Sequence, residues 1–403
     1  MLELLTEAKN LHMEHLEDNI LNGGVDGTRQ TINFLRSLRD MLSGTSSSSV
    51  NISVKWDGAP SIFAGTDPRD GKFFVAKKSI FNKNPKVYKT RQDIDDDLSG
   101  DLREKFLTAL KYLPQLRIDG IVQGDFLYTK SDLGVERING KRYLTFHPNT
   151  IVYAVPMDSE LAYDIRRSKM GVVWHTKYVG RDFESLSAQY NQDIVGTMRR
   201  SNNVWFTDAT YRDVSGTATM NSSETREINM LLSQAGSLFN KINKREFDRL
   251  VDNDDLLIRL KTFNNSKIRD QQPIGDPAAH VGQFIVYLEE FFEKELSKRS
   301  TPRGKEAVLS KKENLFDDLY PDELVKILTM YNIIIECKKI LIKKLNRASS
   351  LDTFLLTNKG FKVTNQEGFV VADRFGSNAV KLVDRLEFSY SNFSSEVIKG
   401  FQR

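Results

Sequence analysis

The chain has 403 residues, of which 39% are hydrophobic and 28% are charged, a balance typical of globular proteins. No apolar run approaches the roughly 20 residues that a membrane-spanning helix needs, so we expect no membrane partner. The single cysteine, Cys337, excludes an internal disulfide, and the net charge of +4 fits a partner with phosphates without requiring one. A chain of this length exceeds one typical core, which favours two or three domains or one core with a large insertion.

Residues 1–45 form an N-terminal helical segment. Leucine and isoleucine recur there at helical spacing, and the glycine-rich residues 22–27 interrupt the pattern. This predicts a helical hairpin that turns at residues 22–27. Glu3 and Glu7 stand where a secretory signal would have a basic start, so we expect a cytoplasmic protein.

Residues 50–180 change to the periodicity of strands and predict the first part of an antiparallel-rich α+β core. Strands are expected at 50–56, 61–64, 72–76, 120–128, 142–146 and 150–155, with a helix near 102–113. Amphipathic helices then predict a mainly helical insertion over residues 181–350. Strand patterns return in residues 351–403, at 360–364, 368–372 and 379–383, and we expect them to complete the sheet that begins near residue 50.

Lys55 ends an apolar strand and opens the segment Lys-Trp-Asp-Gly. A lysine becomes a nucleophile when burial or neighbouring cations lower its pKa, because only the neutral amine attacks. Asp57 is a candidate to bind a metal or to orient the amine, and Gly58 would let the backbone approach a phosphate. Three lysines elsewhere are candidates to supply the cationic field: Lys77, Lys78 and Lys381.

Four later strands follow Lys55 in order, and each delivers one or two polar residues from an apolar run. They are centred on Asp125, Tyr153, Glu367 and Lys381. The ordered set resembles the covalent nucleotidyltransferase superfamily, which comprises DNA ligases, RNA ligases and mRNA capping enzymes. The resemblance covers residues 50–180 and 355–400, and it implies an ATP-grasp-like ligase core.

The resemblance also implies roles for single residues. Lys55 would carry AMP from ATP as a lysyl-AMP phosphoramidate, and Lys381 would hold the α-phosphate. Asp125 would contact the ribose, and Glu367 would help bind Mg²⁺ or Mn²⁺. The other implied nucleotide-binding residues are Asp57 and Gly58 beside the nucleophile, Lys77 and Lys78 as further cations, and Phe126 or Tyr153 stacked on the base.

The chain departs from the superfamily pattern at several positions. Pro60 follows the motif glycine by two residues where arginine or asparagine is usual, and it cannot donate a hydrogen bond. Asp125 replaces a glutamate, and Val383 replaces a second lysine. Glu367 lies 312 positions after Lys55, a separation that the helical insertion would explain.

We therefore expect an ATP-dependent polynucleotide ligase that acts on nucleic acid ends, with the inserted helices as candidates to grip the nucleic acid. RNA is favoured over DNA because only 18 residues follow Arg385, too few for an OB-fold. Capping of RNA, modification of a protein, and a noncatalytic nucleic-acid-binding or virion-associated module that keeps the fold remain open. The first residues also resemble uncharacterised ligase-like proteins of tailed bacteriophages, which would place the protein in the host cytoplasm.

Overall fold

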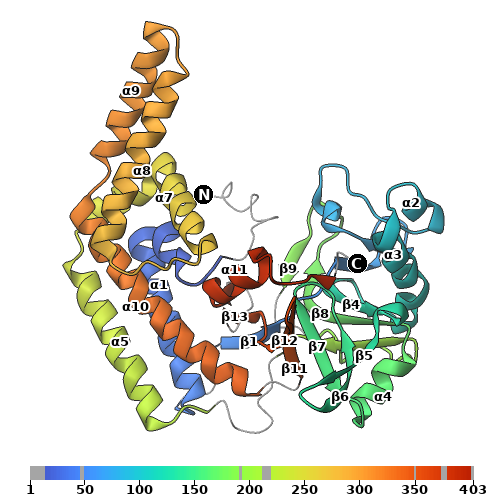
Figure 1. Cartoon of the computed structure of the whole chain (residues 1–403). Coiled ribbons are helices and arrows are strands. Elements are labelled where there is room, and N and C mark those ends of the chain that lie inside the picture. The colour runs from blue at the N-terminus through green and yellow to red at the C-terminus, as the bar shows by residue number, and fades with distance from the viewer. Residues whose placement is uncertain are drawn as a thin grey trace.

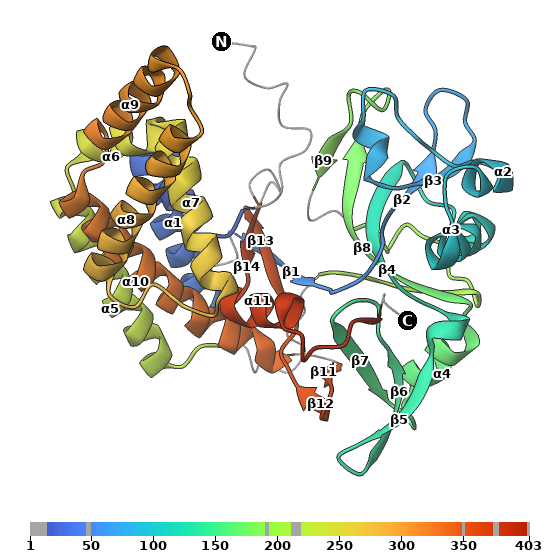
Figure 2. The same cartoon turned by 45° about the horizontal axis from the view of Figure 1, so that its top comes forward.

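The computed structural model describes residues 14–45, 50–189, 193–210, 219–348, 351–373 and 379–400. The fold is mixed α+β with largely antiparallel sheets, as expected. A block of helices lies on one side and two larger sheets lie on the other (Figure 1). Figure 2 shows a small third sheet between them, and this small sheet carries the predicted nucleophile.

The largest sheet has the order β10-β8-β4-β2-β3, with β9 beside β8. Its strands pair antiparallel except for β8 and β10, which are parallel. Helices α2 (Arg91–Asp95) and α3 (Gly100–Tyr112) bury Ile94 and Phe106 against one face, in a core with Val122 and Trp174. The strands are β2 (Ser61–Thr66), β3 (Phe73–Ala76), β4 (Ile121–Thr129), β8 (Met170–Val179), β9 (Ser187–Gln189) and β10 (Val204–Asp208).

A second sheet joins both ends of the predicted core in the order β12-β11-β7-β6-β5. Its antiparallel pair β7 and β11 brings Phe354 beside Val152, so the chain after the helices returns to the strands before them. Helix α4 (Glu160–Arg167) buries Ala162 and Ile165 in its core. The strands are β5 (Gly134–Ile138), β6 (Lys141–Phe146), β7 (Ile151–Pro156), β11 (Asp352–Thr357) and β12 (Gly360–Val363).

The third sheet has the order β1-β13-β14. Strand β1 (Val50–Lys55) pairs antiparallel with β13 (Gly368–Asp373), which pairs with β14 (Ala379–Leu382). Helix α11 (Arg385–Phe393) follows directly. The prediction that the last fifty residues complete the sheet begun near residue 50 is confirmed for β13 and β14, whereas the strand predicted at 360–364 is β12, which pairs with β11 in the second sheet.

The helical block packs on the third sheet through one continuous hydrophobic core. Ile52 of β1 and Val371 of β13 are buried in the same cluster as Ile334 of the central helix α10. The block comprises α1 (Asp18–Leu42), α5 (Ser222–Lys241), α6 (Lys244–Asp252), α7 (Asp254–Arg269), α8 (Pro277–Ser297), α9 (Pro302–Asp317) and α10 (Pro321–Leu345). Across the described parts of the chain, every helix falls short of the length and apolarity that crossing a bilayer requires.

Two features of the fold differ from the predictions: the start of the helical part and the strand β8. The helical part begins at Ser222 rather than near residue 181, because β9 and β10 still belong to the largest sheet. The sequence pattern also missed β8, which lacks alternation because it is buried on both faces: Val172 and Trp174 lie in one core and Val173 in another.

The predicted N-terminal hairpin appears as a sharp bend inside α1. Gly24 has φ 51° and ψ −127°, and the chain folds back there so that Thr31 Oγ1 lies 3.4 Å from the carbonyl oxygen of Leu16. The break therefore lies within the predicted residues 22–27, where the non-helical Gly24 separates two helical stretches of α1. Residues 1–13, where most of the first arm was expected, lie outside the described part of the chain.

A buried ion pair ties the start of the described chain to the centre of the helical block. Lys338 Nζ on α10 lies 2.6 and 2.7 Å from the two carboxylate oxygens of Glu17, and both side chains are almost fully buried. Removing one member of such a pair leaves the other charge uncompensated in a medium of low polarity. The pair therefore makes the packing of residues 14–17 against α10 highly specific.

We predict that Glu17→Gln lowers the free energy of unfolding by about 3–5 kcal/mol, because Lys338 is then buried without a counter-charge. The double variant Glu17→Leu with Lys338→Met should recover most of this loss. Thermal and urea unfolding measure both, with the exposed Lys339→Met as the control. A melting temperature of Glu17→Gln equal to that of the wild type would show that the pair is not formed.

Candidate active site

Lys55 and Glu367 form an ion pair at the junction of the first and last parts of the core. Lys55 is the final residue of β1, and its register partner on β13 is Gly368, the residue after Glu367. The ion pair joins Lys55 Nζ to Glu367 Oε1, and the side chains keep 28% and 9% of their exposure. Antiparallel pairing thus brings the two predicted motif residues into contact.

The charges around this pair control both pKa values. Burial lowers the pKa of Lys55, but the contacting Glu367 and the nearby carboxylates Asp125 and Asp57 outweigh it and raise that pKa above its ordinary value. Burial raises the pKa of Glu367 to about 7, helped by Asp57 and Asp125 and opposed by Lys55. Without a ligand, Lys55 is therefore an ammonium, and the expected lowering of its pKa is not found in this state.

Lys381 joins the same group from β14. Its backbone N–H donates to Glu14 O, and its carbonyl accepts from Leu16 N–H, so an extended N-terminal segment flanks it. Burial and the charge of Lys55 lower the pKa of Lys381. Two partly buried cations that repel each other favour binding of an anion between them.

Asp125 projects from the middle of β4, between Ser61 of β2 and Val173 of β8. Its Oδ2 atom lies 3.7 Å from His175 Nε2, and both side chains are partly exposed. A β-bulge opposite Gln123 and Gly124 turns His175 toward Asp125, and such a bulge has no sequence signal here.

Gly58 has a packing role in the turn after Lys55. A Cβ atom there would lie 2.5 Å from the Cβ of Asp125 and 3.0 Å from the carbonyl oxygen of Phe126. The neighbouring Ala59 N–H donates to Phe126 O at 2.9 Å, and Phe126 N–H donates to Pro60 O at 3.0 Å. The turn after Lys55 therefore lies directly on β4, which only a glycine permits.

Asp57 is a structural anchor and does not face a ligand. Its buried carboxylate accepts four hydrogen bonds of 2.6–2.7 Å, from Asn149 Nδ2, Thr150 N and Oγ1, and Ile151 N. These bonds attach the end of β1 to the start of β7. Three of these bonds go to Oδ2 and one to Oδ1, so the carboxylate serves mainly to hold this segment in place.

Phe126 and Tyr153 are core residues, which corrects their expected stacking on a base. Their exposed fractions are 0% and 1%. Tyr153 OH accepts a 2.7 Å hydrogen bond from Asp57 N–H, and its ring lies 5.0 Å from that of Trp56. Both aromatic side chains hold the segment after Lys55 in place, so they act on the site through packing.

Lys77 and Lys78 are not brought to Lys55 by any contact among the described residues. Lys77 Nζ lies 3.2 Å from Asp97 Oδ2, a carboxylate that also pairs with Lys86. Lys78 is exposed at the start of a short 3₁₀ helix. The structure therefore brings Lys55, Asp125, Glu367 and Lys381 together. No contact among the described residues joins Lys77 or Lys78 to this group.

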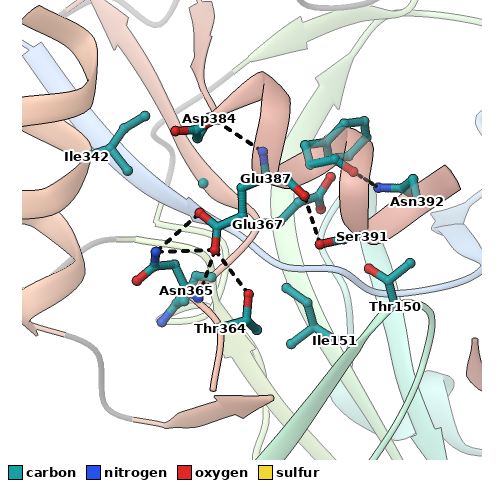
Figure 3. A pocket seen from close by; sticks show the side chains of 13 residues that line it. Thr150, Ile151, Ile342, Thr364, Asn365, Glu367, Asp384, Glu387, Ser391 and Asn392 are labelled. Atoms are coloured by element: carbon teal, nitrogen blue, oxygen red, sulfur yellow. Dashed lines mark hydrogen bonds between the residues drawn. The ribbon is translucent and has the colours of Figure 1, made fainter. Parts of the chain in front are cut away.

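Glu387 on α11 supports the segment that presents Glu367. Its carboxylate accepts hydrogen bonds from Thr364 Oγ1 at 3.1 Å and from Asn365 Nδ2 at 3.2–3.3 Å (Figure 3). Asp384 caps α11 by accepting from the N–H groups of Leu386 and Glu387. Glu387 is a positioning residue that the sequence analysis did not identify, since its partners lie 22 and 23 positions away.

A divalent metal ion at this site would need ligands from the bound substrate in addition to the protein's side chains. Within the described residues, no three His, Cys, Asp or Glu side chains are arranged to hold a metal ion by themselves. Glu367 and Asp125 are the carboxylates that act on Lys55 and are not fully engaged elsewhere. One or two carboxylates together with phosphate oxygens are a usual set for Mg²⁺, so these residues fit that ion with a nucleotide present.

We predict that Asp57→Ala lowers the free energy of unfolding by about 3–5 kcal/mol, because four buried donors lose their acceptor. Thr150→Val removes only one of the four bonds and should cost about 1 kcal/mol. Urea unfolding of both variants tests this graded loss. Equal stabilities for Asp57→Ala and Thr150→Val would contradict the anchoring role.

Glu367 should titrate near pH 7 rather than near its ordinary pKa of 4.5. Between these values the folded protein binds a proton that the unfolded chain does not, so this group's contribution to stability falls as the pH rises through that window. The carboxyl ¹³C shift of Glu367 reports the titration by NMR. Lys55→Met should raise the pKa of Glu367 further, and a midpoint that stays near 4.5 would show that the carboxylate is not buried.

The comparisons with known proteins return one result. The model of a family of unknown function, DUF6267, matches residues 10–397, nearly the whole chain. No curated protein and no solved structure matches the chain. The three sheets, the helical block and the Lys55 site all fall within the matched residues, and the chain belongs to the DUF6267 family.

Proposed function

We propose that the protein is a covalent nucleotidyltransferase that carries AMP on Lys55, and that it acts as an ATP-dependent polynucleotide ligase. The observation that carries this proposal is the contact between Lys55 and Glu367. Asp125 is close enough to help raise the pKa values of both, and Lys381 is close enough for the charge of Lys55 to lower its own pKa. These are the residues to which the superfamily resemblance assigns the nucleophile, the metal ligand, the phosphate cation and the ribose contact.

The geometry supports a nucleophile that is masked until a ligand binds. Lys55 is held as an ammonium by Glu367, so it must lose a proton before it attacks. The raised pKa of Glu367 makes the contacting carboxylate a better acceptor for that proton than an ordinary glutamate. Nucleotide phosphates near Lys381 would compete for the cations and help the ion pair to open.

In the proposed step, the neutral Lys55 Nζ attacks the α-phosphorus of ATP. A phosphorus–nitrogen bond forms, the bond to the bridging oxygen breaks, and pyrophosphate leaves with that electron pair. The second proton of the amine goes to solvent. A bound Mg²⁺ would neutralise charge on the phosphate oxygens, and Lys381 would stabilise the α-phosphate from the protein side.

The subsequent steps transfer AMP to a 5′-phosphate end, after which a 3′-hydroxyl displaces AMP and joins the strands. Capping of RNA or modification of a protein would use the same first step with another nucleotide or acceptor. The nucleotide that labels Lys55, and the polymer that receives it, distinguish these possibilities.

A noncatalytic nucleic-acid-binding module is the second candidate, and two observations favour it. Val383, at the position of the superfamily's second lysine, is 2% exposed and offers no contact to a phosphate. Lys77, one of the further cations that the resemblance implies, pairs with Asp97 rather than with a residue of the Lys55 site. Lys55, Glu367 and Lys381 nevertheless lie together, an arrangement that a noncatalytic binding module would not require.

We predict that wild-type protein incubated with ATP and Mg²⁺ gains the mass of one AMP, whereas Lys55→Met gains none. Lys381→Met should form the adduct about 100-fold more slowly, since it lacks one charged donor to the reacting phosphate. Lys86→Met is the control, because it alters an exposed lysine that pairs with Asp97 and does not contact Lys55 in any described interaction. Intact mass spectrometry provides the measurement, and an adduct on Lys55→Met would refute the proposal.

A further inference from the structure

We propose that the tip of the α8–α9 arm binds the sugar–phosphate backbone of nucleic acid. The arm consists of α8, α9 and their connection, and it projects beyond the rest of the helical block (Figure 1). We define its tip as residues 294–312. This surface lies outside the Lys55 site, and the inference does not depend on nucleotidyl transfer.

The tip holds the whole positive excess of the protein. Residues 294–312 contain seven lysines and arginines and two glutamates, a net charge of +5. The full chain carries +4, so the remaining residues together carry −1. The cations are Lys294, Lys298, Arg299, Arg303, Lys305, Lys311 and Lys312. Charge of one sign gathered on one projecting hairpin favours an anionic partner.

Two of these cations stand where they do not stabilise their own helix. Arg303 and Lys305 lie in the first turn of α9, which contains no acidic residue. The positive end of the helix dipole makes cations unfavourable there, and Asp or Glu is the usual choice. Both side chains are exposed, and in the described part of the chain neither pairs with a carboxylate. A phosphate bound at this turn would contact both cations and the positive end of α9.

A cavity of about 430 Å³ opens beside this turn, between α7, α8 and α9. Its lining includes three cations, Arg259, Arg299 and Lys311, and one carboxylate, Glu295. The Arg259 guanidinium lies over the ring of Phe291, with 3.5 Å from Cζ to the ring centroid. Its Nε atom is buried without a hydrogen-bond partner among the described residues, a donor that a ligand would satisfy.

The arrangement fits a polymer with regularly spaced charges. The cations extend from the end of α8 across the connection into α9, a length that several consecutive phosphates would cover. Arg299 and Lys311 also pair with Glu295 and Asp255, but their side chains remain about half exposed. A nucleic acid strand would release counterions on binding, and its affinity would depend strongly on salt.

The test is binding of fluorescent RNA and DNA oligonucleotides to the full chain, measured by anisotropy over a series of salt concentrations. The arm variant combines Arg299→Ala, Arg303→Ala and Lys305→Ala. The control variant combines Arg226→Ala, Lys241→Ala and Arg245→Ala, which removes the same charge from exposed positions of α5 and α6.

Loss of three phosphate contacts should reduce the slope of log affinity against log salt by about 2 to 3, because each contact contributes about 0.7 to 0.9. The control should keep the wild-type slope. An unchanged slope for the arm variant, or an equal decrease for the control, would overturn the proposal, as would binding of heparin but of neither oligonucleotide. Adduct formation by the arm variant with ATP is measured separately, so failure of this site and failure of Lys55 chemistry are distinguishable.

Discussion

The antiparallel pairing of β1 with β13 is the contact on which the candidate site depends. It places Lys55 opposite Gly368, and thereby Lys55 Nζ against Glu367, although more than 300 residues separate them. The helical block packs against the sheet that this pairing forms, through Ile52 and Val371. A change that shifted this register by one residue would turn Lys55 to the opposite face of the sheet and separate it from Glu367.

The residues around Lys55 divide into those that face the site and those that hold it. Asp57 fastens the end of β1 to β7, while Gly58 lets the turn lie on β4. Glu387 of α11 holds the segment before Glu367 by accepting a hydrogen bond from Thr364. This support keeps Lys55 and Glu367 in contact, and the resulting ion pair favours the protonated amine.

Charged residues gather in two different ways in this chain, at the Lys55 site and at the tip of the α8–α9 arm. The Lys55 site holds a nearly balanced set of partly buried lysines and carboxylates, whose pKa values are shifted by burial and by each other's charges. The tip of the α8–α9 arm holds exposed cations in excess, where the effect of charge is attraction of a partner. A nucleotidyltransferase with a polymeric acceptor would need both, although each is testable alone.

The sequence by itself determined the α+β class, most strands, the return of the last residues to the first sheet, and the choice of Lys55, Asp125, Glu367 and Lys381 as a group. Local periodicity carries the information on class and strands, whereas the choice of these four residues is what the resemblance to the nucleotidyltransferase superfamily implies. Only the tertiary structure decided that Asp57, Phe126 and Tyr153 support the site from within the core and that Lys77 pairs with Asp97. It also decided that Lys55 is protonated, because burial and long-range charge contacts depend on neighbours that no local pattern specifies.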